Sequence, residues 1–356
     1  MNRIGREFRT CTIVFMLAAA LPQTADWERI EGGEGTSCGL GSPFYFFGKL
    51  ESQERLFVFL GGGGACWDGA TCDVERGARF SYASDTIRPY QRGLLDDSNE
   101  ANPFRDYSVL IIPYCTGDLN LGSRIVEYTR SEPGELPPNF SVYHLGAENV
   151  RTALAWIRER VPSPETVVVG GQSGGAPSSP WVAALLAREY RSARVVQIGD
   201  AAGGLIVPRL TGRLLQHWRA DSVLVADGLI EEGEVPEVTL DDLYVGAARV
   251  ADNLRISQLN SVDDPTQLSF LNLVGLNVTA LSSVLAPSLS KIEASVPGFR
   301  FFLVEGDKHV FLSSPMVYQT VSEGTSLVGW IAALGAGQEV ESVGRSLLTR
   351  DSVQRQ

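Results

Sequence analysis

Histidine is scarce in this chain, whose 356 residues include only three: His144, His217 and His309. Chemistry that needs an imidazole as a base or a ligand must therefore use one of these three side chains. The cysteines form no Cys-x-x-Cys pair and stand far from every histidine in the sequence, which argues against a structural zinc site. We therefore expect no metal centre.

Positive charge is also in short supply, because 30 lysines and arginines stand against 42 aspartates and glutamates, a formal net charge of −12. No basic run is longer than two residues. A nucleic-acid partner is therefore not expected, since a protein that reads a phosphate backbone needs clustered positive charge. With 44% hydrophobic and 20% charged residues, the composition also excludes a disordered or fibrous protein.

Long hydrophobic runs are missing, apart from one near the N-terminus at 11–21. That run is about 11 residues long, too short to span a bilayer, and it follows Arg3, Arg6 and Arg9 and precedes small residues. This pattern is typical of a secretory signal peptide. We predict a signal peptide at 1–25, a single catalytic domain at 26–356, no stable membrane span, and a secreted or periplasmic protein.

Short runs rich in β-branched and aromatic residues recur along the chain. Several are apolar on both faces, as in strands of a sheet covered on each side. The later runs alternate with helical patterns at 147–160, 179–190 and 325–336, which predicts an α/β fold with a mostly parallel central sheet flanked by helices. The interval 205–251 predicts an inserted helical cap. The predicted strands are 44–50, 55–60, 108–114, 141–145, 166–171, 193–199, 254–260 and 300–305.

The segment Gly171-Gln172-Ser173-Gly174-Gly175 follows a predicted strand and precedes a predicted helix. It fits G-x-S-x-G, the sharp turn that presents a nucleophilic serine at the end of a strand. Small residues must flank such a serine, because β-carbons would collide with the sheet and the helix. We predict Ser173 as the nucleophile.

A serine nucleophile needs a base, and in hydrolases of this kind the acid and then the histidine follow the serine in the chain. Only His309 fits, because it lies on a polar loop after the strand 300–305. His144 ends an apolar strand before the serine, and His217 lies in the predicted cap. We predict His309 as the base and a structural role for His144.

The acid that orients the histidine should follow a strand between Ser173 and His309. Asp263 and Asp264 follow the strand 254–260, where such folds usually place the acid, but the strand count does not separate the two. Asp200 ends the preceding strand, where we expect a turn or helix-capping role. Asp307 lies two residues before His309 and would order that loop.

A glycine run at 61–64 follows the strand 55–60 directly. Bare backbone N–H groups at this place form part of the oxyanion hole in esterases, together with the N–H after the serine. We predict Gly64 or Ala65, with Gly174, as donors. A phosphate-binding loop is the alternative, but the run lacks the lysine and Ser/Thr of that motif.

Five segments together resemble the pectin acetylesterase/Notum carboxylesterases of the α/β-hydrolase superfamily. The resemblance implies an α/β-hydrolase fold, places the acid on Asp264, and extends over most of the chain. Ala65 stands where animal and plant members often carry tryptophan, and we expect a bacterial-type member. The segments are the Gly-Cys-Trp stretch at 62–68 with Cys72, the Pro-Tyr-Cys-x-x-Asp turn at 113–118, the serine turn at 171–175, the Asn-Ser-x-x-Asp-x-x-Gln stretch at 260–267 and the histidine loop at 306–309.

Of the five cysteines, one lies in the predicted signal peptide and four remain, an even number that allows three pairings. Cys66 and Cys72 are close enough in sequence to close a local loop. The even count and the family resemblance then favour a second disulfide between Cys38 and Cys115.

The predicted function is hydrolysis of short acyl esters, with acetyl the first candidate, by Ser173, His309 and Asp264 through an acyl-enzyme. No cofactor is required, and the partner is an ester substrate such as an acetylated polysaccharide. The cap should line the site with apolar residues and with Arg209, Arg213 and Arg219. The alternatives are a catalytically inactive binding protein of the same fold, or a serine peptidase or lipase.

Overall fold

The computed structural model describes residues 26–76, 84–132, 134–205 and 207–349 of this chain. The predicted signal peptide at 1–25 lies outside the described residues. Within the described residues, no helix has both the length and the apolar character needed to cross a bilayer.

An eight-stranded sheet forms the centre of the protein, with the strand order β1-β2-β4-β3-β7-β8-β9-β10. From β4 to β10 in this order all neighbours are parallel, whereas β1 and β2 join antiparallel at one edge. The predicted mostly parallel sheet is therefore confirmed. The strands are β1 (Glu28–Glu31), β2 (Tyr45–Lys49), β3 (Arg55–Leu60), β4 (Ser108–Ile112), β7 (Thr166–Gln172), β8 (Arg194–Asp200), β9 (Leu254–Ser261) and β10 (Arg300–Val304).

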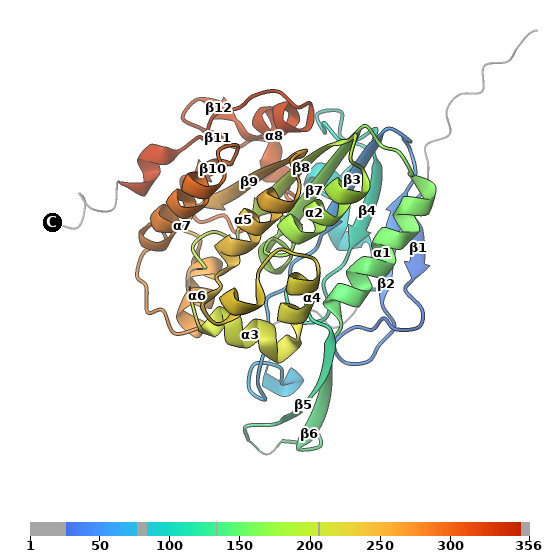
Figure 1. Ribbon diagram of the computed structural model, residues 1–356, viewed down its shortest axis with the longest axis vertical. Helices are drawn as coiled ribbons and strands as arrows, with labels where there is room; N and C mark the ends of the chain where they lie inside the picture. The colour runs from blue at the N-terminus through green and yellow to red at the C-terminus, as the bar shows by residue number, and fades with distance from the viewer. Residues whose placement is uncertain (1–25, 77–83, 133, 206, 350–356) are drawn as a thin grey trace, which may run out of the picture.

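Helices cover both faces of the sheet, as the strands with two apolar faces require. Val167 and Val169 of β7 pack into a large apolar cluster with one group of helices, while Val168 packs into a second cluster with the opposite helix. Figure 1 shows the first group in front of the sheet. That group is α1 (Gly146–Arg160), α2 (Ser179–Glu189), α5 (Leu240–Val250) and α7 (Ser282–Ser295), and the opposite helix is α8 (Leu327–Gly335).

The segment 205–251 does not form one inserted cap, because its last helix, α5, packs on the central sheet. α5 packs against α2 and β9, as expected for the crossover helix between the parallel strands β8 and β9. Only the earlier part is an additional helical group next to the carboxyl ends of the strands (Figure 1). It consists of α3 (Leu210–Trp218), α4 (Ala220–Ala226) and the 3-10 helix η5 (Glu232–Glu237).

The predicted strand 141–145 lies outside the main sheet. It is β6 (Asn139–His144), which pairs antiparallel with β5 (Arg124–Thr129) in a separate hairpin that protrudes from the body (Figure 1). In β6, Val142 and His144 are buried whereas Asn139 and Ser141 are exposed, so only one face is covered. This alternation distinguishes β6 from the two-faced strands of the sheet.

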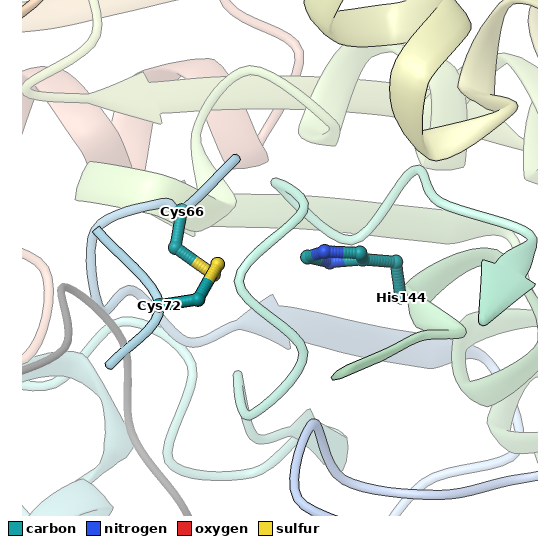
Figure 2. A group of neighbouring side chains, drawn as sticks. All are labelled: Cys66, Cys72 and His144. Carbon is teal, nitrogen blue, oxygen red and sulfur yellow. A yellow bond between two sulfur atoms is a disulfide. The ribbon is translucent and has the colours of Figure 1, made fainter. Parts of the chain in front are cut away.

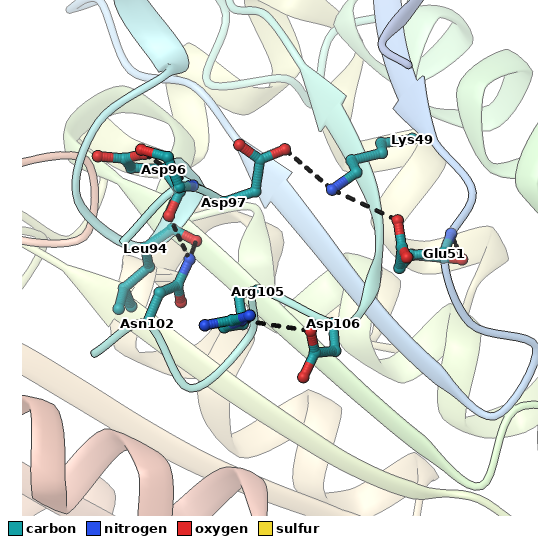
Figure 3. A network of polar contacts seen from close by, with 10 residues as sticks. Lys49, Glu51, Leu94, Asp96, Asp97, Asn102, Arg105 and Asp106 are labelled. Atoms are coloured by element: carbon teal, nitrogen blue, oxygen red, sulfur yellow. Dashed lines mark hydrogen bonds and ion pairs between the residues drawn. The ribbon is translucent and has the colours of Figure 1, made fainter. Parts of the chain in front are cut away.

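The antiparallel edge of the sheet is fastened by a buried lysine (Figure 3). The side chain of Lys49 is only 4% exposed, and its Nζ lies 2.9 Å from Asp97 Oδ2 and 3.5 Å from Glu51 Oε2. A buried ammonium is costly without such partners. The Asn102 side chain donates to the carbonyl of Leu94, which holds the segment that covers the second apolar cluster.

One disulfide joins the segment before β2 to the loop after β4, and a second closes a short loop after β3. The structure bonds Cys38 to Cys115, 77 residues apart in the sequence, and Cys66 to Cys72, six residues apart. Both bonds are buried. These are the pairs that the sequence and the family resemblance favoured.

Candidate active site

Ser173 occupies a strained turn between the parallel strand β7 and α2. Its φ is +49°, in the left-handed region that side chains other than glycine rarely adopt. A β-carbon on Gly171 would lie 2.4 Å from the Gly175 carbonyl oxygen, and one on Gly175 would lie 2.2 Å from the Gly61 oxygen. Glycine is therefore the residue that fits on both sides of the serine, as the motif predicts.

His309 and Asp264 reach the serine from the loops after two neighbouring strands, β10 and β9. His309 Nε2 lies 2.9 Å from Ser173 Oγ, and His309 Nδ1 lies 2.6 Å from Asp264 Oδ2. A carboxylate only accepts hydrogen bonds, so Nδ1 carries the proton and Nε2 accepts from the serine hydroxyl. The three residues thus form a continuous hydrogen-bonded chain.

The structure distinguishes Asp264 from its neighbour Asp263. Asp264 is fully buried and caps α6 (Pro265–Leu273), since its Oδ1 accepts from the backbone N–H groups of Thr266 at 2.9 Å and Gln267 at 3.0 Å. Asp263 is exposed, and its N–H donates to the Gly306 carbonyl. The helix cap therefore fixes one oxygen of Asp264 and leaves the other for His309.

Asp200 lies beneath the same histidine loop. It is fully buried at the end of β8, and its Oδ2 accepts from Phe311 N at 2.6 Å and Leu312 N at 2.8 Å. Its Oδ1 is buried and has no hydrogen-bond partner among the described residues. Burial raises the pKa of Asp200 to about 7, although these two N–H groups and the nearby His309 act against that rise. Asp200 supports the loop and makes no hydrogen bond to the imidazole.

The glycine run after β3 lies against the serine turn. A β-carbon on Gly174 would lie 3.2 Å from the Gly64 backbone nitrogen and 3.3 Å from that of Gly63. Gly64 has a φ of +84°, which glycine adopts without strain. Among the described residues, no backbone carbonyl accepts from the N–H of Gly64. Ala65, which was also predicted as a donor, directly follows Gly64 and is buried.

A small, mainly apolar pocket opens at Ser173, and we call it the acyl pocket. Its volume is about 100 Å³. None of the arginines expected from the segment 205–251 lines it; Arg209 is exposed and pairs with Glu237 instead. Apart from Ser173 and His309, its walls are Gly64, Leu119, Gly174, Pro177, Ala201, Leu205, Thr266, Gln267 and Phe270.

The apolar wall residues Leu119 and Phe270 were not identified from the sequence. Leu119 directly follows the Pro-Tyr-Cys-x-x-Asp turn at 113–118. That turn was therefore the sequence signal that could have placed Leu119 near Ser173. A larger groove of about 560 Å³ lies at the amino ends of β8, β9 and β10, at the opposite edge of the sheet, and no histidine lines it. The larger groove therefore lies away from Ser173.

The other two histidines, His144 and His217, make hydrogen bonds to the protruding hairpin. The Tyr128 hydroxyl lies 2.9 Å from His144 Nε2 and 2.7 Å from His217 Nε2, and His144 Nδ1 lies 2.9 Å from the Thr116 carbonyl. Burial lowers the pKa of His144 to about 3. Both residues therefore join β5, β6 and α3, which agrees with the structural role predicted for His144.

Cys66, Cys72 and His144 are the one group of potential metal ligands found together among the described residues (Figure 2). The two sulfur atoms are bonded to each other, and both ring nitrogens of His144 have hydrogen-bond partners. A metal needs thiolates and a free imidazole nitrogen. This group therefore does not fit a metal ion.

Comparison with known proteins gives a partial match to one family, although no family profile matches the chain. Over 105 residues the chain is 32% identical to the palmitoleoyl-protein carboxylesterase NOTUM of Schmidtea mediterranea, covering 28% of this chain and 20% of that protein. Over 105 residues it is 30% identical to the inactive palmitoleoyl-protein carboxylesterase notum1b of Danio rerio, covering 28% of this chain and 76% of that protein. The chain belongs to the Notum/pectin acetylesterase family.

Proposed function

We propose that this protein is a serine carboxylesterase with an α/β-hydrolase fold, in which Ser173, His309 and Asp264 form the catalytic triad. The observation that carries the proposal is the hydrogen-bonded chain from Ser173 Oγ through His309 to the buried Asp264. Each residue comes from a different loop at the carboxyl ends of the strands. In this arrangement the imidazole can take the serine proton as the hydroxyl attacks.

In the first half of the reaction, Ser173 Oγ attacks the ester carbonyl and His309 Nε2 takes its proton. Asp264 holds the imidazole in the required tautomer and stabilises the cation that forms. His309 then gives the proton to the departing alcohol, which leaves an acyl-enzyme. Water repeats the sequence and releases the acid, with no cofactor required.

Backbone N–H groups of Gly64, Ala65 and Gly174 would bind the negative oxygen of the tetrahedral intermediate. The free N–H of Gly64 and the close approach of Gly174 to the Gly64 backbone nitrogen, beside Ser173, support this assignment. Loss of one such donor typically slows a hydrolase by about 10²–10³-fold. These donors are fixed in place before the substrate binds, so they need no reorganisation during the reaction.

The size of the acyl pocket favours short acyl groups, from acetyl to about butyryl. A dry, apolar cavity of about 150 Å³ holds a six-carbon ring, and the acyl pocket is smaller, about 100 Å³. The two relatives are named for palmitoleoyl-protein substrates, which carry a much longer chain. We therefore assign this chain a different acyl preference, and an acetylated polysaccharide is one candidate substrate class.

A catalytically inactive binding protein is the second candidate, because one of the two relatives is named inactive. The intact triad geometry favours activity. Hydrolysis of p-nitrophenyl acetate decides between the two, with Ser173→Ala as the matched control. We expect turnover that the variant loses; equal rates for both proteins would contradict the esterase. A comparison of ester and amide substrates tests the peptidase alternative.

We also propose that the protein is secreted or periplasmic. The buried disulfides Cys38–Cys115 and Cys66–Cys72 support this location, since such bonds persist in oxidising compartments.

A further inference from the structure

A second apolar pocket lies directly behind the acyl pocket, and we call it the inner pocket. Its volume is about 30 Å³, and α3 contributes Leu210, Leu214 and Trp218 to its walls. Three side chains, Leu119, Leu205 and Phe270, line both pockets. These three residues therefore form the partition that ends the acyl pocket on this side.

Leu119 differs from the rest of the partition in its backbone. Its φ is +59°, and that of the following Asn120 is +60°, so two successive residues adopt the left-handed conformation. Asparagine tolerates this conformation, whereas a leucine adopts it only under constraint from its surroundings. Strain of this kind clusters at functional sites, because the surrounding structure must hold it in place.

Buried polar groups hold the turn in this conformation. The Tyr114 hydroxyl accepts from Leu119 N at 2.9 Å, and Asp118 Oδ1 accepts from Asn120 N at 3.0 Å. Asp118 Oδ2 also accepts from Gly146 N at 2.8 Å, which ties the turn to the start of α1. Tyr114 and Asp118 are at most 1% exposed. These bonds fix the backbone of Leu119, so its side chain starts from a fixed position between the two pockets.

We propose that Leu119 sets the upper limit on the acyl chain length of this enzyme. Its side chain separates the two pockets, so a chain of up to about four carbons fits, and a longer one meets Leu119 before it reaches the inner pocket. The inference rests on the proposed esterase function. It explains how a member of this family selects short esters although apolar space lies behind its acyl pocket.

The test is the acyl-length profile of Leu119→Ala, which joins the two pockets. We expect the ratio of kcat/KM for p-nitrophenyl hexanoate to that for the acetate to rise at least about tenfold over the wild type, since each added methylene can contribute that much. Asn120→Gly is the matched control, because Asn120 shares the left-handed turn but lines neither pocket. Its profile should equal that of the wild type.

Three results would overturn the assignment of Leu119 while leaving the esterase in place. They are a wild-type optimum at eight carbons or more, an unchanged ratio in a folded Leu119→Ala protein, and an equal shift in Asn120→Gly. If the alanine variant does not fold, Leu119→Gly removes the same side chain and relieves the left-handed backbone. Absence of Ser173-dependent turnover with every ester would instead contradict the proposed function itself.

Discussion

Among single residues, we expect the loss of the Asp264 carboxylate to reduce activity more than the loss of any other acid. In Asp264→Asn an amide group would face His309 and favour the tautomer with its proton on Nε2, which cannot accept from Ser173. We expect kcat for p-nitrophenyl acetate to fall by up to about 10⁴-fold with little change in KM. The exposed neighbour offers a matched control, and Asp263→Asn should keep most of the activity. The opposite ranking would move the acid by one residue.

The loop that carries His309 depends on groups beyond the proposed triad. Asp200 fixes Phe311 and Leu312 through their N–H groups, and the Ser313 hydroxyl donates to the Gln172 side chain at 2.6 Å. The Ser261 hydroxyl donates to the Lys308 carbonyl at 2.6 Å. Three adjacent strands, β7, β8 and β9, thus anchor the one loop, which explains how a short segment keeps the imidazole in place.

The buried carboxyl of Asp200 should make stability depend on pH. Burial raises its pKa to about 7, so the folded protein favours the protonated form more than the unfolded chain does. The resulting stabilisation is fully present below the unfolded pKa of about 4 and is lost as the pH rises through about 7. We expect the wild type to lose stability relative to Asp200→Asn between pH 5 and pH 8, as measured by urea unfolding.

The control for this experiment is Asp263→Asn, which removes an exposed carboxylate from a neighbouring loop. Its stability relative to the wild type should change little over the same pH range. If the difference between the wild type and Asp200→Asn were the same at both pH values, Asp200 would not be the group that titrates.

The strands of the sheet were predictable because burial on both faces leaves a continuous apolar run, as in β7 and β8. The interval 205–251 was harder to predict, because α3 and α5 are both amphipathic and only their partners differ. α3 lines the inner pocket, whereas α5 packs against α2 and the sheet. Sequence spacing alone did not separate Asp263 from Asp264. The helix cap that distinguishes them depends on a backbone turn, and the prediction of Asp264 came from the family resemblance.

In the whole molecule, we expect one disulfide to contribute mainly to the free energy of unfolding and the other mainly to activity. Cys38–Cys115 closes a loop of 77 residues, and its removal should cost about 4 kcal/mol of unfolding free energy in the chain-entropy picture, against about 2 kcal/mol for the six-residue Cys66–Cys72 loop. Cys66, however, directly follows Gly64 and Ala65, which we propose as oxyanion donors. Its N–H donates to the Gly117 carbonyl, and its own carbonyl accepts from Trp218 Nε1.

Stability and activity should therefore rank the two disulfides in opposite order. The paired change Cys38→Ser and Cys115→Ser should lower the free energy of unfolding more, while leaving kcat of the folded enzyme close to that of the wild type. The pair Cys66→Ser and Cys72→Ser should unfold less easily than the first variant but lose more of its kcat, because the Gly64 and Ala65 donors lose their anchor. Urea unfolding and initial rates with p-nitrophenyl acetate, measured on both variants, give the two rankings. If the Cys38/Cys115 variant instead lost both more stability and more kcat than the Cys66/Cys72 variant, the position of the Gly64 and Ala65 N–H groups would not depend on the neighbouring disulfide.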